Sequence, residues 1–147
     1  MKTFTLQIAF ILVALIFIGT TNVSAQKAKK EAVLWSAEDI KWEPLKNSGP
    51  APSTAMNAKL WGDDTKGAYG GLTKFPANFK APLHYHTNDM KIVVIQGAYI
   101  YNGKKYGPGS YLFIPGGEKH ESAGAEDSET IFFIEQPGKF DIKPVKQ

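Results

Sequence analysis

Two residue types are missing from this chain of 147 residues, and each absence excludes a class of chemistry. Without cysteine, the protein can form no disulfide, no thiol nucleophile and no zinc site built from thiolates. Without arginine, no guanidinium group can hold a carboxylate or phosphate through two parallel hydrogen bonds. An anionic ligand would therefore have to be met by lysine, by backbone amides or by a bound metal ion.

Long apolar runs are also scarce, and the clearest one lies near the N-terminus. Lys2 precedes an unbroken apolar run over residues 8–18, and Val23-Ser24-Ala25 has the small residues of a cleavage site. The run falls short of the ~18 apolar residues that a membrane-spanning helix needs. We therefore predict that residues 1–25 are a secretory signal peptide rather than a retained membrane anchor. The mature protein is then periplasmic or secreted, with no membrane association.

Charge of one sign does not dominate, since the net charge is only +3. The basic cluster Lys27, Lys29 and Lys30 lies in a segment, residues 26–37, that we interpret as a solvated N-terminal arm. Elsewhere the lysines are scattered, which argues against a nucleic-acid partner. Residues 38–147 have the length of a single domain.

Short apolar runs separated by glycine and proline indicate strands and turns throughout this domain. We expect strands over residues 40–45, 55–61, 68–75, 83–86, 91–96, 98–101, 111–114, 119–122 and 130–135. Residues 46–54 have the composition of a loop, and Asn102-Gly103 is a strong hairpin signal. No segment keeps a helical apolar period over three turns. The sequence therefore predicts an all-β sandwich or barrel.

Histidine occurs three times, and two of these residues, His84 and His86, are separated by one position. In a strand, such residues point to the same face, about 7 Å apart along the chain. Both imidazoles can then reach one ion, because metal–nitrogen bonds are about 2 Å long and the side chains can lean inward. The alternative is a pair of barrel-lining polar residues that hold ordered water.

The third histidine, His120, ends the segment Gly109-Ser110-Tyr111-Leu112-Phe113-Ile114-Pro115-Gly116-Gly117-Glu118-Lys119-His120. This pattern is a strand, a tight turn built from proline and glycine, and a histidine at the start of the returning strand. Together with His84-Tyr85-His86 and the later Gly97, it resembles the two motifs of the cupin superfamily. The resemblance implies one cupin barrel, a double-stranded β-helix or jelly roll. It also implies that His84, His86 and His120 bind one divalent metal ion: Fe(II), Zn, Mn or Ni.

One motif position departs from the cupin pattern. Cupins usually carry a glutamate four residues after the second histidine, where this chain has Met90, and a thioether is a poor ligand for a hard divalent ion. Asp89 is the nearest carboxylate, and it could join the metal site and the chemistry there or serve as a surface turn residue. Strand alternation places Met90 and Gln96 on the face that bears the site, if no bulge intervenes, so Gln96 is expected to hydrogen-bond a ligand or water.

Three further segments, Leu60-Trp61-Gly62-Asp63, Pro108-Gly109-Ser110-Tyr111 and Gly138-Lys139-Phe140-Asp141, narrow the resemblance. They are similar to a branch of small exported cupins near the ChrR-like anti-sigma-factor and acetylacetone-dioxygenase-like cupins. Three histidines leave coordination positions open, so a metal-dependent enzyme is expected, either an oxygenase or a lyase or isomerase. The resemblance favours oxygenase-like chemistry on a small diketone or phenolic compound. It also supports Asp89 as a nearby carboxylate.

Other functions stay open beside the enzyme. A metal-holding cupin can bind a small ligand, as a sensory module does, without turning it over. A structural barrel with a vestigial site is a third alternative, against which the complete set of histidines argues. Because many cupins pair through strand edges, a homodimer is the default expectation. The aromatic candidates for the pocket wall are Trp61, Tyr69, Phe75, Tyr99, Tyr101 and Phe133, although for each of them a place in the barrel core is the favoured interpretation.

Overall fold

The computed structural model describes residues 31–46 and 53–146. The predicted signal peptide lies outside these residues, as does most of the predicted loop over 46–54. The helix found in the described chain is a short 3-10 turn, Ala37–Asp39. Within the described ranges, no helix is both long enough and apolar enough to cross a membrane.

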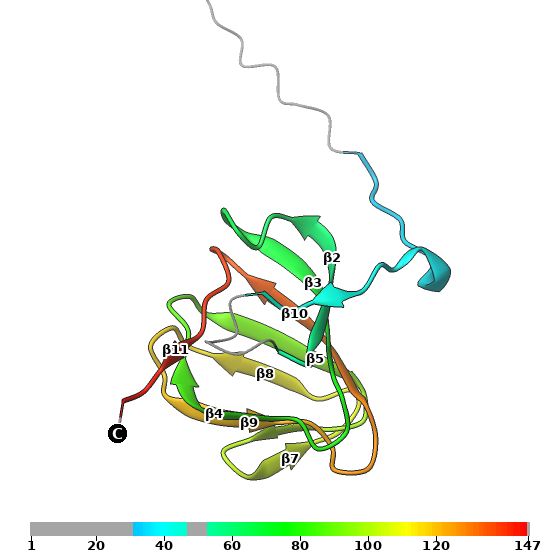
Figure 1. Cartoon of the computed structure of the whole chain (residues 1–147). Coiled ribbons are helices and arrows are strands. Elements are labelled where there is room, and N and C mark those ends of the chain that lie inside the picture. The colour runs from blue at the N-terminus through cyan, green and yellow to red at the C-terminus, as the bar shows by residue number, and fades with distance from the viewer. Residues whose placement is uncertain (1–30, 47–52, 147) are drawn as a thin grey trace, which may run out of the picture. The chain divides into compact units, whose positions relative to one another are not determined.

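Two antiparallel sheets form nearly all of the described structure (Figure 1). The six-stranded sheet runs β1 (Glu43–Pro44), β2 (Met56–Gly62), β3 (Tyr69–Phe75), β10 (Thr130–Gln136), β5 (Met90–Gln96) and β8 (Tyr111–Ile114). The five-stranded sheet runs β11 (Lys143–Pro144), β4 (Lys80–Tyr85), β9 (His120–Ala123), β6 (Tyr99–Tyr101) and β7 (Lys104–Tyr106). Successive strands repeatedly cross from one sheet to the other, as in a jelly roll. The all-β prediction is therefore confirmed.

Alternation of buried and exposed side chains explains how the two sheets enclose the core. In β10, Thr130, Phe132, Ile134 and Gln136 are buried, while the residues between them are only partly covered. Burying each large apolar side chain contributes about 1.5–3 kcal/mol relative to leaving it exposed. This inner face of β10 lies at the centre of the six-stranded sheet and packs into the aromatic and aliphatic core.

Most predicted strands are present with small shifts of their ends. The strand over residues 111–114 has the expected bounds, and six others differ by one residue at one or both ends. Asn102 and Gly103 have φ values of 46° and 78°, and they join β6 to β7 as the predicted hairpin. The least well predicted strands are β1 and β11, with two residues each, and β7, with three. So few residues cannot show an alternation of apolar and polar side chains.

A bulge in β5 changes the direction of its last residues. Val94 pairs with Phe132 and Gln96 pairs with Ile131, so Ile95 has no partner opposite it on β10. The extra residue breaks the alternation, and both Ile95 and Gln96 are exposed. This corrects the expectation that Gln96 shares the inner face of the strand with Met90.

Candidate metal centre

The three histidines come together inside the barrel. His84 on β4 and His120 on β9 are cross-strand partners, and His86 follows β4 directly. The ring centroids lie 4.4 Å apart for His84 and His120, 5.0 Å for His84 and His86, and 5.5 Å for His86 and His120. All three side chains are buried, His120 completely.

Each imidazole is oriented by a backbone carbonyl. Nδ1 of His84 lies 2.7 Å from the Pro82 oxygen, Nδ1 of His86 lies 2.5 Å from the Asp141 oxygen, and Nδ1 of His120 lies 3.0 Å from the Glu118 oxygen. A carbonyl can only accept, so Nδ1 must carry the proton in each ring. The lone pair is therefore on Nε2 in all three histidines. Histidines that bind metals are arranged in the same way, with one nitrogen on the ion and the N–H of the other donated to a carbonyl or carboxylate.

The unprotonated nitrogens suit a metal ion. The three potential ligand atoms lie within 4.8 Å of one another, so modest ring rotations would bring all of them within the ~2 Å reach of one ion. Nε2 of His120 is buried and has no hydrogen-bond partner among the described residues. An unpartnered buried acceptor costs about 1–3 kcal/mol, which a bound cation would offset. The residues present therefore fit one divalent metal.

Burial also keeps these rings in the ligating form. Desolvation is the largest influence on all three, and it lowers the pKa of His84, His86 and His120. For His86 the pKa falls to about 4. The rings are therefore neutral at neutral pH and can accept a metal without first releasing a proton.

Asp141, in the loop after β10, fixes the position of His86 through a hydrogen bond to its ring. While its main-chain oxygen accepts from His86, the Asp141 carboxylate accepts from the Thr87 amide at 2.8 Å and from the Thr87 hydroxyl at 2.5 Å. The Phe140 ring centroid lies 5.7 Å from that of His86. Sequence reasoning noticed the Gly138–Asp141 segment only as part of a family resemblance. It gave Asp141 no role, because nothing local indicates a partner 54 residues away.

Tyr101 packs against His120 and is itself hydrogen-bonded to Glu118. The Tyr101 ring stacks on His120 with centroids 5.2 Å apart, and its hydroxyl donates to the Glu118 carboxylate. Burial, followed by this hydrogen bond, raises the pKa of the Tyr101 hydroxyl, so that it keeps its proton. The Glu118 carboxylate is thus engaged as an acceptor beside the metal centre.

The structure does not bring Asp89 into the histidine group. Its side chain is exposed, and Oδ1 accepts a hydrogen bond of 2.8 Å from the Gly116 amide. This bond ties the loop after His86 to the turn that precedes His120. Met90, by contrast, is buried with 2% of its surface exposed and lines a cavity together with His84 and His86. Among the described residues, the histidine group has no carboxylate member.

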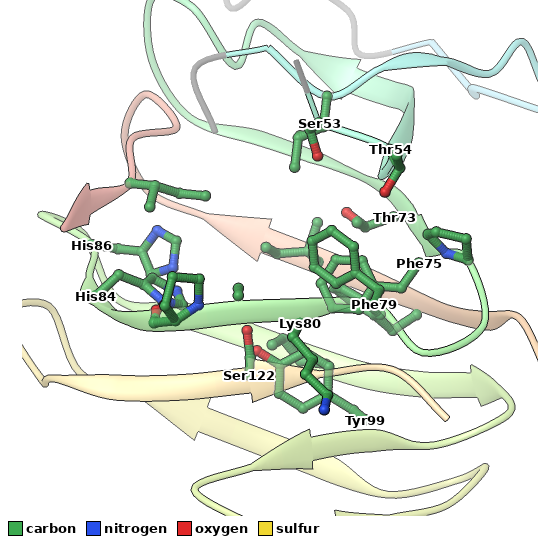
Figure 2. A pocket seen from close by; sticks show the side chains of 18 of the residues that line it. Ser53, Thr54, Thr73, Phe75, Phe79, Lys80, His84, His86, Tyr99 and Ser122 are labelled. Atoms are coloured by element: carbon green, nitrogen blue, oxygen red, sulfur yellow. The ribbon is translucent and has the colours of Figure 1, made fainter. Parts of the chain in front are cut away.

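A cavity of about 480 Å³ is lined by His84 and His86. Figure 2 shows His84 and His86 at one end of it and Phe75 and Phe79 toward the other. Of the aromatic candidates for the pocket wall, Phe75 and Tyr99 line this cavity, whereas Trp61 is exposed and Phe133 is half-buried on the outer side of β10. The wall is mostly apolar, and its polar side chains other than histidine are Ser53, Thr54, Thr73, Asn78, Lys80, Tyr99 and Ser122.

Comparison with known proteins agrees with this architecture. A family model described as "Domain of unknown function (DUF4437)" matches residues 32–147. No curated protein sequence matches the chain significantly.

Solved structures identify the fold. An RmlC-like cupin protein from Ralstonia eutropha JMP134 has 24% identity and a TM-score of 0.60, and the match covers 75% of this chain and 69% of the other. The polyketide cyclase RemF from Streptomyces resistomycificus has 21% identity, a TM-score of 0.63 and coverage of 82% and 87%. The anti-sigma protein ChrR of Rhodobacter sphaeroides, in complex with SigE, has 19% identity, a TM-score of 0.54 and coverage of 69% and 51%. The predicted cupin-type jelly roll is therefore confirmed.

Proposed function

Because this chain belongs to the DUF4437 family and has a cupin fold, we propose that it is a metal-dependent enzyme acting on a small organic molecule. The observation that carries the proposal is the group of three buried, neutral imidazoles, oriented through Nδ1, of which His84 and His86 line a cavity. A divalent ion held by three side chains keeps coordination positions open for a ligand.

The cavity supports a ligand that is largely apolar. Its volume of about 480 Å³ falls in the lower part of the ~300–1,000 Å³ range of small-molecule sites. Phe75 and Phe79 offer flat apolar contacts away from His84 and His86 (Figure 2). A substrate with an apolar or ring-containing body and oxygen atoms at the histidine end would fit. A small diketone or a phenolic compound has these features.

The roles of the chain's own groups follow from their positions. The three histidines would hold the metal. The main-chain carbonyls of Pro82, Glu118 and Asp141, which accept from Nδ1, would keep Nε2 of each ring facing the ion. The apolar wall excludes water, which strengthens electrostatic interactions inside the cavity. The metal would supply Lewis-acid chemistry or, as Fe(II), oxygen chemistry of the dioxygenase kind.

A non-catalytic binding or sensory function is the second proposal, and one observation favours it. No aspartate or glutamate is among the described residues that line the cavity. An enzyme that needs a general base would therefore lack a carboxylate for this purpose at the cavity wall. The anti-sigma protein ChrR among the structural neighbours is a regulatory cupin, although that likeness concerns the fold alone.

Oxygen uptake separates the two proposals. The protein is loaded anaerobically with Fe(II) and mixed with a panel of small diketones and catechols, and oxygen consumption is followed with an electrode. The enzyme proposal expects uptake with at least one compound, and loss of that uptake in His84→Ala. Compounds that bind with no uptake, and with no conversion under Zn, Mn or Ni, would contradict the enzyme proposal and favour the binding one.

A further inference from the structure

The side chain of Gln136 is buried without any visible hydrogen-bond partner. Only 1% of the residue is exposed, and neither Nε2 nor Oε1 makes a hydrogen bond to a described residue. A buried amide left unpaired is costly, and native proteins rarely tolerate one without a reason. Gln136 therefore has no hydrogen-bond partner among the described residues, and a bound water or ligand would supply one.

The register of the sheet places this amide beside Met90. Gln136 pairs with Tyr69 of β3 on one side. On the other side, Ile134 pairs with Ile92 and Glu135 with Lys91, so the next step in the same register sets Gln136 opposite Met90. Directly opposed residues have Cβ atoms about 4.5–5.5 Å apart. Since Gln136 and Met90 are both buried, the two side chains adjoin on the inner face.

This row of side chains lies at the histidine end of the barrel. Met90 lines the same cavity as His84 and His86. On the Tyr69 side, Tyr69 and Phe140 line one small gap, and the Phe140 ring lies 5.7 Å from that of His86. Gln136 therefore adjoins Met90, which lines the cavity of His84 and His86, and Tyr69, which lies near Phe140.

We propose that Gln136 is a positioning residue of the metal site, whose amide holds a water or ligand hydroxyl at the coordination position that Met90 leaves without a donor. The amide offers N–H donors and an acceptor oxygen, and a water or a hydroxyl group, which can both accept and donate, suits either of them. A thioether at position 90 supplies neither. This inference rests on the proposed function, because it presupposes a metal held by the three histidines.

Gln136→Met tests the inference, with Gln96→Met as the matched control on the exposed glutamine of β5. The first measurement is the thermal unfolding of the metal-free proteins. If the amide has no structural partner, Gln136→Met is at least as stable as the unmodified protein. A clear fall in Tm for Gln136→Met alone would show that the amide stabilises the fold, and would overturn the inference without touching the metal proposal.

The second measurement uses Co(II)-loaded protein and the oxygen chelator acetohydroxamic acid as probe, followed by visible absorption. We expect Gln136→Met to bind stoichiometric Co(II) but to weaken chelator binding about tenfold, the worth of one hydrogen bond in a buried site. Gln96→Met should behave as the unmodified protein. Equal chelator affinity in Gln136→Met would overturn the inference alone. Failure of the unmodified protein to bind Co(II) would overturn the proposed function and the inference with it.

Discussion

In all three histidines, Nε2 is the nitrogen that is free to bind a metal ion. In each ring the other nitrogen faces a carbonyl oxygen, and the three carbonyls come from Pro82, Glu118 and Asp141. Two of these belong to the residue two positions before the histidine, whereas the third comes from the loop after β10. The ring orientation is thus set partly by local chain geometry and partly by a long-range contact.

Replacing Asp89 tests the assignment of its carboxylate to the loop. Asp89→Asn keeps an oxygen that can accept from the Gly116 amide, whereas Asp89→Ala removes it. We expect metal affinity to be unchanged in both variants, and Asp89→Ala to lose about 1 kcal/mol of unfolding free energy. Urea unfolding and Co(II) titration provide the measurements. A metal affinity that falls more than tenfold in both variants would instead make Asp89 a ligand.

The grouping of the three histidines in one site could be predicted from sequence, because strand alternation and a turn motif determine where their side chains point. The positions of Asp89 and Gln96 could not. Asp89 is held by a hydrogen bond to a turn 27 residues away, and Gln96 is turned outward by a bulge. Gln136 escaped notice because an isolated glutamine in an apolar strand gives no signal until its lack of partners is seen.

At the level of elements, the strand end at Gly97 offers a matched pair of variants. Gly97 has a φ of +68°, and a Cβ there would lie 2.4 Å from the Glu129 carbonyl oxygen. Gly103 has a φ of +78° but nothing within 4 Å of an added Cβ. Gly103→Ala should cost only the backbone strain of about 1 kcal/mol. Gly97→Ala should cost roughly 2–3 kcal/mol more, since the backbone must move apart.

Urea unfolding of the metal-free variants measures this difference. Similar losses in Gly97→Ala and Gly103→Ala would contradict a close approach between Gly97 and β10. The pair also separates strain, which both variants share, from steric conflict, which only one has.

Strands whose inner residues alternate could be predicted almost to the residue, as β8 and β10 show. The pairing of β4 with β9, which sets His84 opposite His120, could not be read from the strands themselves. It depends on how long connections cross between the sheets. The resemblance to the two cupin motifs, rather than the alternation within each strand, indicated that these histidines lie together.

For the whole molecule, the lowered histidine pKa values predict acid sensitivity. Between pH 6.5 and about 4, His86 takes up a proton in the unfolded chain but not in the folded one. The contribution of His86 to the free energy of unfolding is therefore fully present above pH 6.5. It falls by about 3 kcal/mol as the pH is lowered through this window. Urea unfolding of the metal-free protein as a function of pH measures the slope. His86→Gln should flatten it, and an unchanged slope would contradict the assignment.

Export gives a second prediction at this scale. If residues 1–25 are a signal peptide, the protein recovered from the periplasm or medium begins at Gln26, and its intact mass corresponds to residues 26–147. Mass spectrometry of the fractionated cells provides the answer. A full-length protein that stays with the membrane fraction would contradict cleavage and support an anchor.

The most direct measurement of the central claim is the metal content of the mature chain, purified without a histidine tag and analysed by inductively coupled plasma mass spectrometry. The three-histidine site predicts about one divalent ion per chain, and its loss in His120→Ala, whose Nε2 is the buried atom without a partner. Gln96→Met, on the surface, should retain the ion. No bound metal after loading with Fe(II), Zn, Mn or Ni, or full retention in His120→Ala, would contradict the account.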